Sequence, residues 1–80
     1  MPLSVVPTPV GNMGDMTIRG LEALRAADTI ACEDTRRTLK LLNFYDIRRP
    51  LLSYHKHNER ARTEEIMGRL ELGETVALVS

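Results

Sequence analysis

The alternation of short apolar runs with longer segments of helical periodicity is the feature that most constrains the fold of this chain. Four such runs occur at residues 3–6, 29–32, 50–54 and 75–79, and the last is made of β-branched and small apolar residues. Chains that alternate strands with helices in this way build parallel strands joined by helical crossovers. We therefore predict an α/β fold with a parallel sheet made of βαβ units.

The first predicted helix begins near a capping residue and carries apolar side chains on one face. Asp15 is placed to cap it, and Ile18, Leu21 and Leu24 recur every three residues along it. Gly20 within this helix costs about 1 kcal/mol relative to alanine, so packing must compensate for it.

Two further helices are predicted after the second and third strands. Asp34 or Thr35 can cap the second helix, and Asn58 can cap a longer third helix that runs through Leu72. Gly73 is the expected stop signal of that third helix. Its inner face is expected to carry Ile66, Met67 and Leu70.

The run at residues 75–79 predicts a strand that is covered on both faces. Ligands of open parallel sheets bind in the loops beyond the carboxyl ends of the strands, and here the sequence stops at Ser80 before such a loop. We expect residues 1–80 to form an incomplete N-terminal α/β domain that ends after its fourth strand, with a second domain absent. We also expect an exposed apolar edge at residues 75–79 that promotes association.

Composition narrows the class of protein without identifying a ligand. A chain of 80 residues with 42% hydrophobic side chains suffices for one small domain near marginal stability. Its 11 basic and 11 acidic residues cancel, so the net charge favours neither the presence nor the absence of a polyanionic partner. The sequence has one cysteine, no secretory signal pattern and no apolar run near the ~18 residues of a membrane span. These features predict a cytoplasmic protein with no membrane partner.

Polar clusters follow the predicted strands, at the ends where a parallel sheet gathers its loops. These clusters lie at residues 7–15, 33–37 and 55–58. Because the strands are expected to be parallel, all three clusters should emerge at one edge of the sheet, together with whatever follows Ser80. We therefore expect the ligand site at this edge.

The loop at residues 7–15 is rich in proline and glycine and leads toward a helix. Its Gly11-x-x-Gly14 spacing lets backbone approach a ligand closely. It is not a P-loop, because Asp15 takes the place of the lysine, and it lacks the three-glycine dinucleotide fingerprint. From spacing alone, the loop is either a stiff connecting turn or one wall of a ligand site.

The cluster at residues 33–37 contains two carboxylates and two guanidinium groups at a strand-to-helix junction. Glu33 or Asp34 could cap the helix, orient a substrate hydroxyl or accept its proton. Arg36 and Arg37 could hold phosphates, although a solvated side chain is the simpler interpretation of Arg37.

The cluster at residues 55–58 has two histidines but no obvious third ligand nearby, so we predict no metal site. It either contacts a substrate or another subunit, or Asn58 simply caps the helix. Cys32 lies within an apolar run and is expected to be a buried strand residue rather than a nucleophile.

Four separate motifs together resemble those of the tetrapyrrole-methylase superfamily, and they extend over nearly the whole chain. The motifs are Val6-Pro7-Thr8-Pro9-Val10-Gly11-Asn12-Met13-Gly14-Asp15, Thr17-x-Arg19, Glu33-Asp34-Thr35-Arg36 and Ser53-Tyr54-His55-x-His57-Asn58-Glu59. The first motif is similar to the RNA-directed branch, which methylates the ribose 2′-hydroxyl of a cytidine in small-subunit ribosomal RNA. The porphyrin-directed branches instead have a Gly-x-Gly-Pro-Gly-Asp type of first loop.

The resemblance implies a methyltransferase that uses S-adenosyl-L-methionine, binds it between two α/β domains and forms a homodimer. Its implied partner is the ribosomal RNA of the small ribosomal subunit. It also implies an Asp-Ala-Gly-Thr-Pro loop after the fourth strand, so the 80-residue chain by itself is expected to be inactive. Methylation of a small tetrapyrrole and a non-catalytic binding or assembly role remain the alternatives.

The resemblance also implies roles for residues of this chain. Glu33 and Asp34 are the expected catalytic carboxylates. The residues expected to border the methyl donor are Pro7, Thr8, Pro9, Gly11, Asn12 and Gly14, and those expected to bind the substrate are Arg36, His55 and Asn58.

Overall fold

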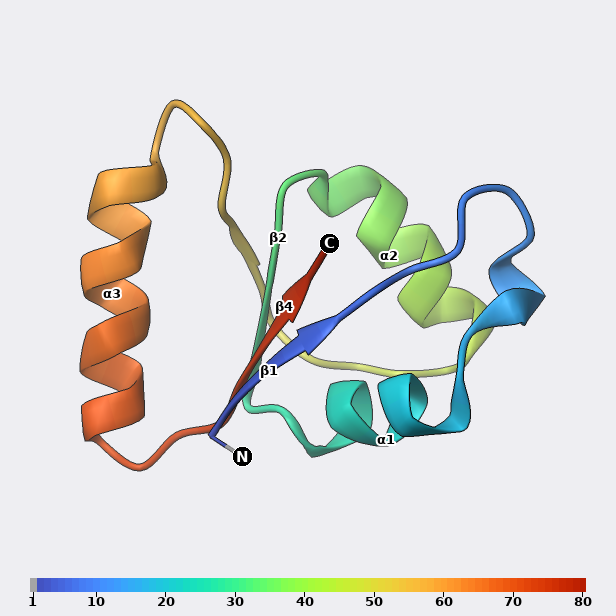
Figure 1. Ribbon diagram of the computed structural model, residues 1–80, viewed down its shortest axis with the longest axis horizontal. Coiled ribbons are helices and arrows are strands. Elements are labelled where there is room, and N and C mark those ends of the chain that lie inside the picture. The colour runs from blue at the N-terminus through green and yellow to red at the C-terminus, as the bar shows by residue number, and fades with distance from the viewer. Residues whose placement is uncertain (1) are drawn as a thin grey trace.

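The computed structural model describes residues 2–80 and shows a four-stranded parallel sheet between two layers of helices (Figure 1). The strands are β1 (Leu3–Val6), β2 (Thr29–Cys32), β3 (Leu51–Ser53) and β4 (Val76–Val79). The helices are α1 (Ile18–Ala26), α2 (Thr35–Phe44) and α3 (Glu59–Glu71), and a 3₁₀ turn, η1, spans Met13–Asp15. All three strand pairings are parallel, so the predicted α/β class is confirmed.

The strand order is β1-β4-β2-β3, which places the last strand between the first two. The crossovers through α1 and α2 move one way across the sheet, and the crossover through α3 moves back. A right-handed crossover that reverses direction must lie on the opposite face, which is where α3 lies in Figure 1. This return path carries β4 into the centre of the sheet.

The expectation of an exposed apolar edge at residues 75–79 is therefore wrong. Val76 is in register with Leu3 on one side and with Thr29 on the other, and Val76 and Ala77 are fully buried. Within residues 2–80, the free edges of the sheet belong to β1 and β3. The local pattern of apolar residues predicts a buried strand but does not say which strands it lies between.

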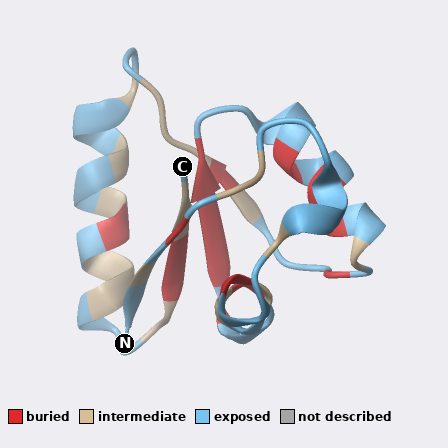
Figure 2. Ribbon diagram, turned by 45° about the vertical axis from the view of Figure 1, so that its right-hand side comes forward, coloured by how far each residue is buried: buried red, intermediate tan, exposed pale blue. Residues whose placement is uncertain are grey.

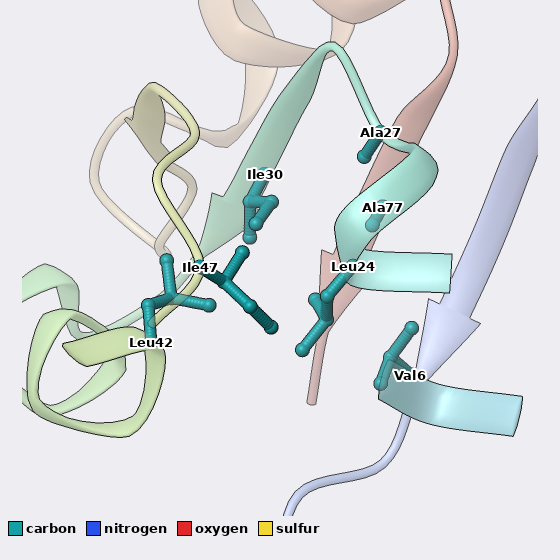
Figure 3. Close-up of a cluster of buried hydrophobic side chains, with 7 residues drawn as sticks. All are labelled: Val6, Leu24, Ala27, Ile30, Leu42, Ile47 and Ala77. Carbon is teal, nitrogen blue, oxygen red and sulfur yellow. The ribbon is translucent and has the colours of Figure 1, made fainter. Parts of the chain in front are cut away.

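Buried side chains form one apolar cluster on each face of the sheet. Figure 3 shows the larger cluster, which joins α1 and α2 to the sheet through Val6, Leu24, Ala27, Ile30, Leu42, Ile47 and Ala77. The smaller cluster lies under α3 and consists of Ala31, Leu52, Ile66 and Val76. Figure 2 shows that burial is greatest in the central strands and that the helices expose their outer sides.

The start of α1 differs from the expectation that Asp15 caps it. Asp15 instead lies in the turn η1, and Thr17 is the N-cap residue, whose hydroxyl accepts a hydrogen bond from the Gly20 amide at 2.9 Å. As a result, Ile18 stands at the exposed first position of the helix and is 78% exposed. The apolar spacing located the helix correctly, but its first apolar residue lies outside the core.

The other two helices begin and end close to their predicted limits. Asp34 caps α2, with its Oδ1 accepting from the Arg37 amide at 3.1 Å, and Gly73 ends α3 with a φ of +85°. Met67 was expected on the inner face of α3 and is instead 52% exposed, which corrects that prediction. It lies about 100° around the helix from buried Ile66, on the side away from the sheet.

Candidate functional site

The carboxyl ends of the parallel strands meet at one edge of the sheet, and a pocket of about 510 Å³ opens there. A pocket of that size falls within the range of roughly 300–1,000 Å³ that is typical of small-molecule sites. It is lined by Thr8, Pro9, Gly11, Met13, Cys32, Glu33, Asp34, Arg37, Thr38, Lys40, Leu41, Val79 and Ser80. The first loop, the β2–α2 junction and the end of β4 therefore share one cavity.

Four hydrogen bonds hold the first loop in place over this pocket. The amide and hydroxyl of Thr8 both donate to the Ser80 carbonyl oxygen, at 3.2 Å and 2.9 Å. The guanidinium of Arg37 donates to the Pro9 carbonyl oxygen at 3.0 Å, and the hydroxyl of Tyr45 donates to the carbonyl oxygen of Met13. Because Arg37 and Tyr45 lie at opposite ends of α2, this helix supports the loop along its length (Figure 1).

The residues expected to border a donor divide into two groups. Thr8, Pro9 and Gly11 line the pocket, whereas Pro7, Asn12 and Gly14 do not. The side chain of Asn12 accepts a hydrogen bond from the Gly14 amide at 2.8 Å and so shapes the turn η1. Gly11 has a φ of +145°, a conformation that residues with a Cβ rarely adopt, so this position requires glycine.

The two carboxylates expected to be catalytic both lie on the pocket wall, directly after β2. Glu33 and Asp34 are exposed to solvent, and Asp34 also caps α2. Their neighbour Arg36 is exposed and does not line the pocket, whereas Arg37 does. The prediction of a solvated Arg37 is therefore incomplete, because the contact with Pro9 gives this side chain a definite position.

The loop at residues 55–58 lies outside this pocket, beyond the edge strand β3. Asn58 precedes α3 but makes no side-chain cap, which corrects that expectation. Its amide group instead closes the loop, with Oδ1 accepting from the His55 amide at 2.8 Å and Nδ2 donating to Ser53 Oγ at 3.0 Å. The structure therefore does not bring His55 or Asn58 to the residues that line the pocket.

Cys32 occupies the floor of the pocket as the last residue of β2 and is 1% exposed. Burial raises the pKa of its thiol, and the hydrogen bond with Thr38 only partly opposes that effect. A thiol with a raised pKa is protonated at neutral pH and is a poor nucleophile. The expectation that Cys32 is a buried strand residue is confirmed.

Several lining residues had no assigned role from the sequence, among them Met13, Thr38, Lys40 and Leu41. Three of them, Thr38, Lys40 and Leu41, belong to α2. The apolar periodicity of α2 located its buried side, but the pocket depends on how the loop folds over it, and that was not visible in the helix pattern.

The site combines a carboxylate pair with a stiff backbone loop and an apolar floor. Carboxylates within hydrogen-bond reach of a hydroxyl can orient it and accept its proton. The glycine at position 11 allows close backbone approach, and the buried floor excludes water from one side. Among residues 2–80 there is no group of three side chains placed to hold a metal ion. The arrangement suits a small ligand next to a polar acceptor.

Comparison with known proteins places the chain in a family. The family model for tetrapyrrole (corrin/porphyrin) methylases matches residues 2–80. The chain therefore belongs to the tetrapyrrole methylase family, as its motifs indicated.

Its curated relatives carry a more specific name. The chain is 51% identical over 78 residues to ribosomal RNA small subunit methyltransferase I of Synechocystis sp., which covers 98% of this chain and 28% of that protein. Proteins of the same name from Bacillus subtilis and Thermotoga maritima are 49% and 51% identical, again over 98% of this chain and over 27% and 35% of their own lengths. The chain thus spans about a quarter to a third of the length of these relatives.

In the part of the chain that the structure describes, no helix is both long and apolar enough to cross a membrane.

Proposed function

We propose that this chain is the first part of an N-terminal domain in a longer S-adenosyl-L-methionine-dependent methyltransferase that acts on small-subunit ribosomal RNA. The observation that carries this proposal is the identity of about half of all residues, along 78 positions, to proteins named ribosomal RNA small subunit methyltransferase I. The sequence of the first loop, which resembles that of the RNA-directed branch, supports the 2′-hydroxyl of a cytidine ribose as the acceptor.

The pocket fits a methyl donor of this kind in size and in chemistry. S-adenosyl-L-methionine combines an aromatic base, a sugar and a sulfonium cation, and the pocket combines an apolar floor with two carboxylates. Thr8, Pro9 and Gly11 would hold the donor, and the donor would supply an electrophilic methyl group. In the complete protein, a loop following Ser80 would close the site from the opposite side.

In this proposal the residues of the β2–α2 junction act on the acceptor. Glu33 or Asp34 accepts the proton of the ribose hydroxyl, which is a poor nucleophile while protonated. Main-chain contacts from the first loop fix the distance between the reacting groups, since alignment is the larger part of catalysis for an in-line displacement. The loop at residues 55–58 lies too far along the sheet edge to line the same pocket, so His55 and Asn58 would meet the RNA away from the reacting ribose.

The proposal extends to the location, oligomeric state and domain organisation of the complete protein. We infer a cytoplasmic homodimer with a second α/β domain, on the strength of the family resemblance and of relatives about three to four times as long as this chain. Methylation of a tetrapyrrole is the second candidate, because the matching family model is described by corrin and porphyrin methylases.

A methyl-transfer assay with two acceptors tests the proposal. The complete protein is incubated with radiolabelled donor and with either isolated small ribosomal subunits or a porphyrinoid, and the labelled product is digested to nucleosides. We expect label in a 2′-O-methylated cytidine from the ribosomal subunits and none in the porphyrinoid. Label in the porphyrinoid alone would replace the proposal by the second candidate, and no transfer to either acceptor would leave a binding or assembly role.

A further inference from the structure

The neutral net charge of the chain conceals a strongly basic segment that includes α2. Residues 35–50 contain five arginines and lysines and a single aspartate, whereas the other residues contain six basic and ten acidic side chains. The basic residues of the segment are Arg36, Arg37, Lys40, Arg48 and Arg49, and all five are exposed. Charge is thus concentrated on one part of the surface, although the total is zero.

The three cations of α2 lie on its outward side. At 3.6 residues per turn, Arg36 and Lys40 stand one above the other and Arg37 lies a quarter-turn away, while buried Leu42 is on the opposite side. Figure 2 shows the outer side of α2 as exposed. None of the three forms an ion pair with a carboxylate of residues 2–80.

The half-buried arginines of α3 contrast with this arrangement. Arg62 pairs with Glu65 at 3.0 Å, and Arg69 pairs with Glu65 at 3.1 Å and with Glu74 at 3.3 Å. Acidic residues of the same region therefore neutralise these two arginines. Within residues 2–80, Arg36 and Lys40 on α2 have no such carboxylate partner, and their charge is available to a ligand.

The basic residues also lie next to the candidate active site. Arg37 and Lys40 line the pocket described above, at one side of α2. Arg48 and Arg49 line a second, shallower hollow of about 410 Å³ at the other side of the helix, together with Asn43. The cations thus extend from the rim of the pocket around the outward side of α2 to the second hollow.

An exposed aromatic ring lies within the same surface. Phe44 is 58% exposed and lies at the end of α2, about one turn after Lys40 and on its side of the helix. Its ring packs edge-to-face against Tyr45 at 4.9 Å, which limits its orientations while leaving it open to solvent. Cations beside an exposed aromatic ring are the combination that binds phosphates and stacks on an unpaired base.

We propose that the outward side of α2 binds the sugar-phosphate backbone of the RNA acceptor and leads it into the pocket. We call this surface the α2 basic face and define it by Arg36, Lys40, Asn43 and Phe44. Arg37 is not part of it, because its guanidinium is engaged with Pro9. Arg48, which pairs with Asp46 at 3.5 Å, and Arg49, which donates to the Arg25 and Arg48 carbonyl oxygens, are left out for the same reason. The inference rests on the proposed function and adds the path by which the RNA reaches the site.

Salt dependence distinguishes phosphate contacts from other contacts. Each phosphate neutralised by a protein cation makes the fall of log affinity with log salt concentration steeper, by about 0.7–0.9 in slope. Loss of two such contacts should therefore reduce the slope by about 1.5 and weaken binding most at low salt. Phe44→Leu should weaken binding without changing the slope, because the ring carries no charge.

The test uses the complete protein and naked small-subunit ribosomal RNA. The variant pair Arg36→Gln/Lys40→Gln is compared with the control pair Arg19→Gln/Arg60→Gln, which removes the same charge from exposed positions on α1 and α3. We expect the first pair to weaken RNA binding at least tenfold at about 0.1 M salt and to make the slope less steep. The control pair should keep the wild-type slope.

Three outcomes would overturn this inference. Equal losses in both pairs would show that only net charge matters, and an unchanged slope in the first pair would show that the α2 basic face does not contact phosphates. Loss of binding to assembled subunits with normal binding to naked RNA would identify a protein partner instead. The proposed function is judged separately, because it fails only if the wild-type protein transfers no methyl group to the RNA.

Discussion

Replacing Arg37 by methionine should loosen the loop at residues 7–15 without unfolding the domain. The change removes one hydrogen bond, from the guanidinium to the Pro9 carbonyl oxygen at 3.0 Å. Arginine and methionine have nearly equal helix propensities, so α2 itself should be unaffected. The helix cap is also retained, because Asp34 Oδ1 accepts its hydrogen bond from the backbone amide of residue 37 and not from the side chain.

The expected magnitude follows from the type and the exposure of this bond. A hydrogen bond from a charged group contributes about 1.5–3 kcal/mol when it is well shielded, and Arg37 is exposed, so we expect about 1 kcal/mol here. That energy corresponds to a roughly fivefold change in an opening equilibrium.

Amide hydrogen exchange in the complete protein measures this change. The amides of Thr8 and Gly14 hydrogen-bond on either side of Pro9 and should exchange about fivefold faster, whereas the amide of Ile30 in the central sheet should not change.

Arg36→Met is the matched control for this experiment. Arg36 is the adjacent residue on α2 and is exposed like Arg37, but it does not line the pocket. Its replacement should leave exchange in the loop unchanged. If both variants exchange alike in the loop, the contact between Arg37 and Pro9 does not hold the loop, and the account of how α2 supports it is wrong.

Three other predictions concern stability. Leu24→Ala should lower the free energy of unfolding by about 2–5 kcal/mol in denaturant titrations because Leu24 is fully buried, whereas Leu39→Ala, at a half-exposed position, should cost well under about 1 kcal/mol. Burial raises the pKa of the Cys32 thiol, so the protonated thiol should contribute fully to folding stability below the unfolded thiol pKa of about 8.5. This contribution should be lost as pH rises further. A Cys32→Ala variant that shows the same alkaline loss of stability would contradict this prediction. Glu65→Gln should be destabilising at neutral pH because Arg69 holds the pKa of the Glu65 carboxyl below its usual value. The difference in unfolding free energy between variant and wild type should disappear as pH falls below about 4.3 and through that lowered pKa. A difference in stability that persists in acid would refute the charge interaction.

Most of the fold was predictable because it depends on local patterns. Short apolar runs bounded by proline, glycine and polar residues located every strand, and the carboxylate of Asp34 located the start of α2. The start of α1 was misplaced because Asp15 and Thr17 are both good capping residues, and only the turn η1 decides between them. The position of β4 in the sheet depends on which face of the sheet α3 crosses, and the local sequence pattern does not predict that face.

The candidate site was predictable only in part, for a similar reason. Parallel strands bring their carboxyl ends together, so the approach of Gly11 and Asp34 to one pocket follows from the predicted topology. The supports of the first loop join residues far apart in the sequence, 28 positions for the contact between Arg37 and Pro9. Such contacts appear only once the chain is folded.

The most direct test of the central claim is the rate of methyl transfer by the Glu33→Gln/Asp34→Asn variant of the complete protein. Both replacements keep the size of the side chain, and asparagine caps helices as well as aspartate does, so the structural role of Asp34 is retained while both carboxylates are removed. We predict unchanged unfolding and, at saturating donor, a transfer rate to small-subunit ribosomal RNA that is at least about 100-fold lower, as expected for loss of a general base. Transfer at the wild-type rate would show that the pocket next to the first loop is not where the reaction occurs.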